Sequence, residues 1–322
     1  MKYLLKKSDE VRIIAPSYSG KMIPAPVWEM ALKRLTGLGF KVSFGKHVKE
    51  VDLMESTSIE NRLNDLHEAF ADKSVKGIIC AIGGYNSNFL LDKIDWEILK
   101  KYPKFFGGMS DITVLGNAIY TMTGLKTYQM PNFRNFGQKY GFEYTMEYFV
   151  KEAMENDEVL VKPSKEWSDD RWTKNQEKRK FVKNKGWWVL NEGRVDGVVV
   201  GGNLCSLNLL QGTKYMPDIR NKILFIEDDS MSTAGEFSRN LRSLMQIEGA
   251  LDVKGFVLGR FQKKTKMLRE QLEMIIGDIP ELKNKPILAN VDFGHTDPKI
   301  TWVIGGEVLL DIKKINSELV LK

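Results

Sequence analysis

The 322-residue sequence contains only two cysteines and three histidines, so it has few of the residues that form disulfides or hold metals. Cys80 and Cys205 lie in separate apolar stretches, and neither has the spacing of a zinc site or a redox motif. We therefore expect two buried free thiols in a reducing compartment.

The sequence also lacks long apolar runs. No run is long enough to span a bilayer, and the first ten residues contain lysines but not the continuous apolar segment of a signal peptide. These absences predict a cytoplasmic protein without a membrane partner.

The charge is not strongly of one sign. There are 48 basic and 42 acidic residues, a net charge of +6, and the two signs are interspersed. The densest basic stretch, Arg171 to Lys185, includes Glu177 and follows two aspartates. Nucleic-acid-binding proteins usually concentrate their positive charge, so we expect no nucleic-acid partner. A hydrophobic content of 43% provides a large core, and the length suggests two domains or one large α/β domain with an appendage.

The first half of the chain alternates strand and helix patterns. Short apolar runs predict strands, and amphipathic segments between them predict helices; the strands are 11–15, 40–44, 77–82 and 104–106, and the helices surround Trp28 to Leu35 and Ile59 to Phe70. The run 77–82 is continuously apolar, which is typical of a parallel strand covered on both faces. This order predicts an open parallel sheet, in which ligands bind beyond the carboxyl ends of the strands.

The composition changes at about residue 164. Residues 164–187 are charged and polar, and the tryptophans Trp167, Trp172 and Trp187, followed directly by Trp188, are interleaved with them. Long ordered segments of this kind are often lids or binding loops, although a mobile connection between domains is also compatible with the pattern.

The second half again alternates strands and helices. The predicted strands are 195–200, 222–226, 255–258 and 287–292, and the predicted helices are 233–245 and 267–276. A terminal hairpin is expected from strands 300–304 and 308–312, turned at two glycines.

Ser110 stands at a predicted strand-to-helix turn, after Gly107 and Gly108 and before an apolar helical pattern. Such a turn exposes a serine hydroxyl beside the first free N–H groups of the helix, as in a nucleophile elbow. The backbone N–H groups of Asp111 and of the Gly83-Gly84 loop could then form an oxyanion hole around Gly84. Local preference alone favours a simpler role for Ser110 as the cap of a helix beginning at Asp111. The paired glycines could also form a phosphate loop, although no standard phosphate motif is present.

A serine nucleophile requires a base, and only three histidines are available. His67 lies within an amphipathic helix and His47 has no apparent partner, whereas His295 lies in a polar loop after a strand. A simple turn histidine is the alternative for His295. Glu227 ends a predicted strand and could orient the histidine, but Asp228 and Asp229 are equally allowed by spacing.

Several short motifs, in this order, resemble the LD-carboxypeptidase and microcin-immunity (MccF-like) serine peptidases. They are Val11 to Ser17, Ile82 to Asn88, Gly107 to Asp111, Gly201 to Leu204, Ile226 to Asp228, and Gly294-His295. The resemblance implies a Ser-Glu-His triad of Ser110, Glu227 and His295, no metal, no cofactor and a homodimer. It also implies an α/β fold with a Rossmann-like N-terminal domain, residues 1–163, and a C-terminal α/β domain, residues 189–322. Residues 164–188 would form an active-site loop or linker.

The family divides by substrate between murein tetrapeptides and aminoacyl-nucleotides related to microcin C. Tyr85, Asn86 and Asn88 follow the paired glycines in a pattern that resembles the microcin-immunity branch, as does the tryptophan-bearing segment. In that branch a loop tryptophan stacks on the nucleobase, which makes Trp172 and Trp187 candidates. Asn203 resembles a ligand-contacting residue, with a helix N-cap as the alternative.

The resulting hypothesis is a serine peptidase or amidase acting on a small peptide or aminoacyl-nucleotide. A murein tetrapeptide LD-carboxypeptidase with the same triad is the first alternative. A catalytically silent protein that binds a nucleotide or peptide is the second.

Overall fold

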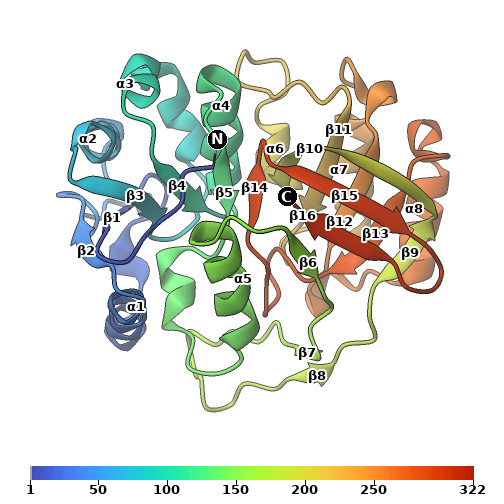
Figure 1. Ribbon diagram of the computed structural model, residues 1–322, viewed down its shortest axis with the longest axis horizontal. Helices are drawn as coiled ribbons and strands as arrows, with labels where there is room; N and C mark the ends of the chain where they lie inside the picture. The colour runs from blue at the N-terminus through green and yellow to red at the C-terminus, as the bar shows by residue number, and fades with distance from the viewer. Residues whose placement is uncertain (1) are drawn as a thin grey trace.

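The computed structural model describes residues 2–322 as two β-sheets that lie side by side, each covered by helices (Figure 1). Met1, the first residue of the predicted N-terminal domain, lies outside the described residues. The two-domain α/β prediction is confirmed.

The first sheet has six strands in the order β14-β5-β4-β3-β1-β2. Its strands are β1 (Glu10–Ile14), β2 (Lys41–Phe44), β3 (Val75–Cys80), β4 (Phe105–Gly108), β5 (Thr127–Gln129) and β14 (Trp302–Ile304). All pairs are parallel except β14 with β5, so the loops after β1, β3, β4 and β5 meet at one edge.

The helices of this half are α1 (Ala25–Gly37), α2 (Ile59–Ala71), α3 (Trp96–Lys101), α4 (Ile112–Thr123) and α5 (Glu143–Ala153). The sequence specifies α2 in a simple way. The Ser58 side chain caps it by accepting the Asn61 N–H, and Leu63, Leu66 and Phe70 bury one face.

The second sheet has eight strands in the order β6-β16-β15-β10-β11-β12-β13-β9. A parallel centre consists of β10 (Gly193–Asn203), β11 (Lys222–Glu227), β12 (Gly255–Gly259) and β13 (Ile287–Val291). Antiparallel strands flank it: β6 (Val159–Val161), β9 (Trp188–Asn191), β15 (Glu307–Ile312) and β16 (Glu318–Leu321). Its helices are α6 (Leu204–Asn208), α7 (Ala234–Leu244) and α8 (Arg269–Gly277).

The predicted terminal hairpin is wrong. Strand β14 pairs with β5 in the first sheet, whereas β15 pairs with β10 and β16 in the second. The glycine turn does not close a ladder between them, because Gly305 N–H donates to the Val199 carbonyl and Gly306 carbonyl accepts the Val199 N–H. Strand β6 crosses in the opposite sense, from the predicted N-terminal segment into the second sheet, so each half contributes a strand to the other.

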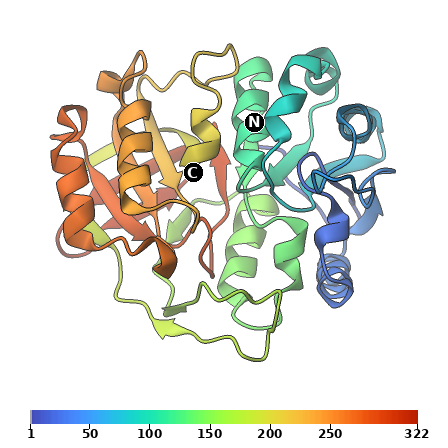
Figure 2. The same cartoon turned by 180° about the vertical axis from the view of Figure 1, so that it is seen from behind.

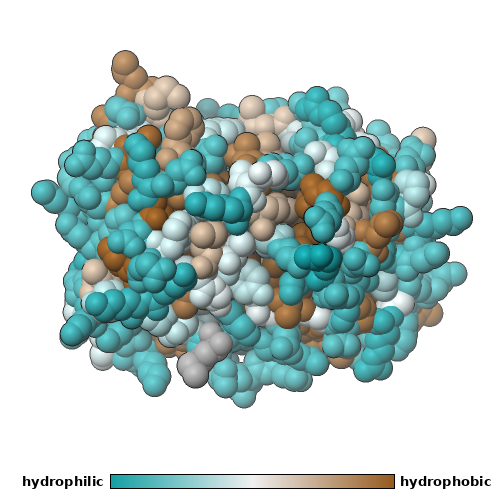
Figure 3. Space-filling model, turned by 90° about the horizontal axis from the view of Figure 1, so that it is seen from above, coloured by the Kyte–Doolittle hydropathy of each residue, from teal (hydrophilic) through white to brown (hydrophobic). Residues whose placement is uncertain are grey.

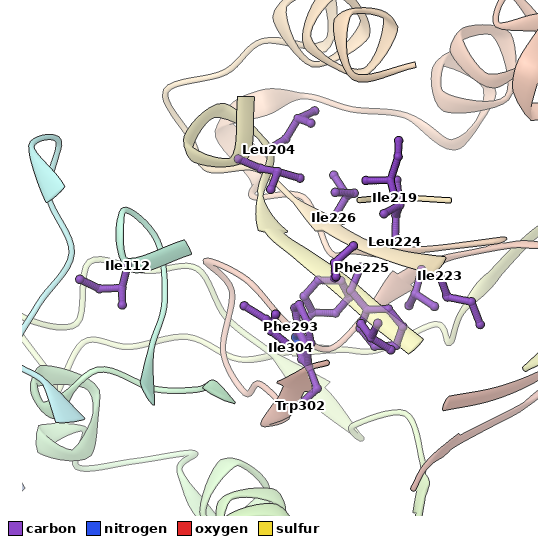
Figure 4. Packing of buried hydrophobic residues seen from close by; sticks show 14 of the residues in the cluster. Ile112, Leu204, Ile219, Ile223, Leu224, Phe225, Ile226, Phe293, Trp302 and Ile304 are labelled. Carbon is purple, nitrogen blue, oxygen red and sulfur yellow. The ribbon is translucent and has the colours of Figure 1, made fainter. Parts of the chain in front are cut away.

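An aromatic cluster fills the contact between the two halves (Figure 4). Trp302 of β14 lies 5.0 Å from Phe225 of β11 and 6.1 Å from Phe293, measured between ring centroids. All three side chains are almost fully buried. Burial of this much aromatic surface holds the two sheets in a defined relative position.

Residues 164–188 run along one edge of the molecule and connect the two halves, which both ribbon views show (Figures 1 and 2). The segment contains the two-residue strands β7 (Glu166–Trp167) and β8 (Val182–Lys183). Ser168 exchanges two backbone hydrogen bonds with Asp297, of 2.7 and 2.8 Å. The segment is therefore anchored beside the loop that carries His295.

The surface is largely hydrophilic on the face shown in Figure 3, with small separate apolar patches. No helix among residues 2–322 has the length and apolarity needed to cross a membrane. Cys80 is buried as expected, but Cys205 is exposed, so the prediction of two buried thiols is wrong for Cys205. The first turn of α6 points Cys205 away from its buried neighbours Leu204 and Ser206.

Candidate active site

Ser110 lies in the sharp turn between β4 and α4. Its φ of +67° is in the left-handed region, which costs a residue with a side chain about 1–3 kcal/mol. The N-cap of α4 is Asp111, not Ser110. The interpretation of Ser110 as the helix cap is therefore wrong, and its hydroxyl projects from a strained turn.

Neighbouring loops hold this turn in place. The Asn132 side chain, at the end of β5, accepts the Met109 N–H at 2.9 Å and donates to the Met109 carbonyl at 3.3 Å. Gly83, at the end of β3, packs directly against Ser110, since a Cβ at Gly83 would lie 2.8 Å from the Ser110 Cβ. Glycine is needed at position 83 because any side chain there would displace the serine.

His295 and Glu227 approach Ser110 from the second sheet. The Ser110 Oγ lies 3.0 Å from His295 Nε2, and His295 Nδ1 lies 2.7 Å from Glu227 Oε2. Glu227 is the last residue of β11 and is buried, while the imidazole retains 21% exposure. The three side chains thus form one hydrogen-bonded chain across the two sheets.

Close packing in the His295 loop brings Glu227 to the imidazole. Gly294 has a φ of +93°, and a Cβ there would lie 2.6 Å from Glu227 Oε2. Only glycine combines this backbone conformation with such a close approach of the carboxylate.

The electrostatics of the pair favour a charged imidazole. Burial lowers the pKa of His295, but the charge of Glu227 and the hydrogen bond to it outweigh burial, and the net shift is upward. Asp228 differs: burial raises its pKa to about 7, and no cation among residues 2–322 forms an ion pair with it. Of the three successive acids, Glu227 is the one that bonds to His295.

The backbone N–H groups of Gly84 and Asp111 belong to the two loops that meet at Ser110. Among residues 2–322, neither the Gly84 nor the Asp111 N–H donates to a protein acceptor. The Asp111 carboxylate fixes the glycine loop, because its Oδ2 accepts from Ser17 Oγ at 2.5 Å, Asn86 N at 3.0 Å and Ser87 N at 2.9 Å. The Asp111 side chain therefore ties the loop that contains Gly84 to the turn that contains Ser110.

Ser110 and His295 open into a cavity of about 390 Å³ between the two halves. Tyr85 lines it with 63% of its surface exposed, and the ring of Tyr18 meets Tyr85 edge-on at 5.8 Å. Trp172 also lines the cavity but is only 5% exposed. The tryptophan segment therefore forms part of the wall, while the freely accessible aromatic face belongs to Tyr85.

The other predicted contact residues lie elsewhere. Trp187 lines a separate depression with Leu190 and Arg269. Asn203 caps α6 by accepting the Ser206 N–H at 3.0 Å, as in the alternative interpretation. Asn86 is bonded to Arg62, and Asn88 lies in the following 3-10 turn and does not line the cavity.

Several cavity residues were absent from the sequence interpretation. They are Tyr18, Asn132, Arg134, Asp297 and Lys299. Asn132 and Arg134 follow β5, a three-residue strand that has no clear pattern in the sequence. Tyr18 follows the first predicted strand, and the rule that ligands bind at strand ends would have indicated it.

The described residues contain no group of three or more histidine, cysteine or acidic side chains that could hold a metal ion.

Comparison with known proteins identifies the family. Residues 11–130 match the N-terminal domain of LD-carboxypeptidases, and residues 196–310 match their C-terminal domain. YocD of Bacillus subtilis (strain 168), which is named as a carboxypeptidase, is 45% identical over 302 residues, covering 94% of this chain and 93% of YocD. The chain belongs to the LD-carboxypeptidase family.

Relatives within this family carry different names. The microcin C7 self-immunity protein MccF of Escherichia coli is 31% identical over 294 residues, covering 87% of this chain and 84% of MccF. The murein tetrapeptide carboxypeptidase of Pseudomonas aeruginosa is 28% identical over 310 residues, covering 94% of this chain and 92% of that enzyme.

Solved structures of LD-carboxypeptidase relatives share the whole fold. A MccF-like protein from Bacillus anthracis superposes with a TM-score of 0.98 at 46% identity, covering 99% of this chain and 98% of that chain. MccF in complex with glutamyl sulfamoyl guanosine superposes with a TM-score of 0.90 at 27% identity, covering 100% and 98% of the two chains.

Proposed function

We propose that this LD-carboxypeptidase family member is a serine peptidase or amidase with Ser110, His295 and Glu227 as its catalytic triad. The observation that carries the proposal is the continuous chain of two hydrogen bonds, 2.7 and 3.0 Å long, from a buried carboxylate to a serine in a strained turn. This arrangement activates a hydroxyl for attack on a carbonyl.

The reaction follows from the roles of the atoms. Ser110 Oγ attacks the carbonyl carbon while His295 Nε2 accepts its proton, and Glu227 stabilises the imidazolium through Nδ1–H. The amides of Gly84 and Asp111 bind the oxyanion. His295 then protonates the leaving nitrogen, and water releases the acyl group by the reverse sequence.

For the substrate we propose an aminoacyl-nucleotide amide of the kind that MccF binds. The high similarity to a MccF-like structure supports this class, as does the exposed ring of Tyr85 at the cavity, which offers a surface for a nucleobase. Trp172 in the wall would contribute packing, and Trp187 would not contact the same ligand.

A murein tetrapeptide is the second candidate, and its support is the P. aeruginosa murein tetrapeptide carboxypeptidase, which aligns with nearly the whole chain. Parallel assays with an aminoacyl-sulfamoyl adenosine and a tetrapeptide ending in D-alanine separate the two. Faster hydrolysis of the tetrapeptide would replace the first substrate assignment while retaining the triad.

The direct test of the nucleophile is Ser110→Ala. We expect kcat to fall by at least about 10³-fold, with ligand binding and thermal stability retained, because only the attacking oxygen is lost. The Ser232→Ala variant, in the loop before α7, is the matched control. A near-normal rate in Ser110→Ala would exclude the proposed nucleophile.

We also propose that the enzyme acts in the cytoplasm as a homodimer. Light scattering of the purified full-length chain at micromolar concentration tests the second point, with twice the 36.9 kDa chain mass expected.

A further inference from the structure

Arg134 places a cation in the cavity beside Ser110, and its guanidinium has no hydrogen-bond acceptor among residues 2–322. It follows Asn132 at the end of β5, in the short 3-10 turn Phe133–Gly137, and lines the same cavity as Ser110 and His295. Its backbone N–H donates to the Ala81 carbonyl at 3.0 Å, which fixes the turn against the end of β3. The backbone of Arg134 is therefore held in place at the wall of the cavity.

The guanidinium group lacks an acceptor. Its Nε is buried without a hydrogen bond, and among residues 2–322 no oxygen accepts from the rest of the group. Burial lowers the pKa of Arg134, only partly offset by the charge of Asp297. A partly buried guanidinium whose Nε has no acceptor is costly, so a ligand that brings an acceptor to this group gains binding free energy.

The other cations near the cavity are already engaged or solvated. Lys299 donates to Asp297, Arg179 lies 2.7 Å from the second oxygen of the same carboxylate, and Lys263 lies 3.0 Å from Asp169. Arg171 is exposed to solvent. Arg134 differs from these cations because its Nε is buried and its guanidinium has no acceptor among residues 2–322.

Trp172 orients this cation. The guanidinium carbon lies 5.8 Å from the centroid of the indole ring, which is itself buried. Contact with the ring restricts the side chain and leaves its N–H groups for the cavity. A planar donor set in a restricted orientation suits a group with two or more anionic oxygens.

We propose that Arg134 is a specificity-determining residue that binds an anionic oxygen group of the substrate. This inference rests on the proposed hydrolytic function and adds a subsite to it. The group is the terminal carboxylate if the substrate is a peptide, or the sulfamoyl or phosphoryl oxygens if it is an aminoacyl-nucleotide. Both present charged or strongly polarised oxygens close to the scissile amide.

The kinetic test uses three substrates. They are a tetrapeptide that has a free terminal carboxylate, the same tetrapeptide as its C-terminal amide, and an aminoacyl-sulfamoyl adenosine. In Arg134→Met, which keeps an apolar contact with Trp172, we expect kcat/KM for the preferred anionic substrate to fall about 10- to 100-fold, mainly through KM. Hydrolysis of the peptide amide should change little. Arg134→Lys should recover part of the loss, and the exposed Arg239→Met serves as the matched control.

A binding test is independent of turnover. In a Ser110→Ala background, calorimetry with the carboxylate peptide, its amide and the sulfamoyl adenosine should show tighter binding of at least one anionic ligand, and Arg134→Met should remove that advantage. The ligand that loses affinity identifies the source of the anionic group. If folded Arg134→Met keeps the selectivity and affinity of the wild type, the inference is overturned. If the wild type hydrolyses none of the substrates but its binding still depends on Arg134, only the proposed function is overturned.

Discussion

At the scale of single residues, the imidazole of His295 connects the two halves of the site. It meets the Ser110 hydroxyl with one nitrogen and the Glu227 carboxylate with the other, so its charge state depends on both. Because Glu227 and its hydrogen bond raise the pKa of His295, protonation competes with base catalysis at a higher pH than for a free histidine.

The Glu227→Gln substitution tests this coupling. The wild type should lose kcat/KM as pH falls through the raised pKa of His295, since only neutral imidazole accepts the serine proton. Removing the carboxylate charge should lower that pKa, move the acidic limb to lower pH, and reduce kcat/KM by about 10²-fold or more. The measurement is a pH–rate profile, with exposed Glu270→Gln as the control; superimposable acidic limbs would contradict the assigned role of Glu227.

The neighbouring Asp228 has a different role, because it is buried and no cation among residues 2–322 forms an ion pair with it. Its pKa is raised from about 3.8 to about 7, so the unfolded chain ionises at a lower pH than the folded one. This difference lowers the free energy of unfolding as pH rises from about 4 to about 7.

Asp228→Asn should therefore stabilise the fold by roughly 1–4 kcal/mol at pH 8, with little change at pH 4. Urea unfolding at the two pH values measures the effect, and the exposed Asp252→Asn should show none. An equal change in the Asp228 variant at both pH values would indicate that its ionisation is not responsible.

At the scale of the elements, strand β14 determines how the two halves meet. It joins the first sheet by pairing with β5, and its Trp302 packs on Phe225 and Phe293 of the other half. Phe225 lies two residues before Glu227 on β11, and Phe293 lies two residues before His295, so the same aromatic cluster supports the backbone that carries both of these side chains.

Trp302→Ala should remove this support. We expect a loss of about 3–5 kcal/mol in the free energy of unfolding and a lower kcat, because the imidazole and carboxylate would no longer be held against Ser110. Denaturant unfolding and kinetics measure the two effects. Trp187→Ala, at a half-buried site away from the cavity, should cost much less; similar losses in both variants would argue against the role of β14.

At the scale of the whole molecule, the sequence predicts the alternating strands and helices of each half. It does not predict that strands β14 and β6 each join the sheet of the other half. Apolar runs such as 77–82 and the Ser58 cap specify strands and helices locally. Similar apolar runs predict the strands that precede Ser110, Glu227 and His295. The pairing of β14 with β5 could not be predicted from the sequence. Two strands joined by two glycines look like a hairpin when only the turn is considered, even if the strands belong to different sheets.

The site was predictable where a residue directly follows a strong strand. Spacing alone allows three acids, Glu227, Asp228 and Asp229; the family resemblance selects Glu227, and Glu227 Oε2 lies 2.7 Å from His295 Nδ1. Arg134 follows a three-residue strand and acts through an unfilled hydrogen-bonding requirement, which only the packed structure reveals. The position of Trp172 in the wall likewise depends on contacts distant in sequence.

The most direct test of the central claim is labelling of the folded full-length chain with a fluorophosphonate, followed by mass spectrometry of the modified peptide. We expect one covalent adduct, on Ser110, and a much slower formation of this adduct in His295→Ala. Modification at another serine, or an equal rate of Ser110 labelling without the histidine, would contradict an activated serine assembled from both halves of the chain.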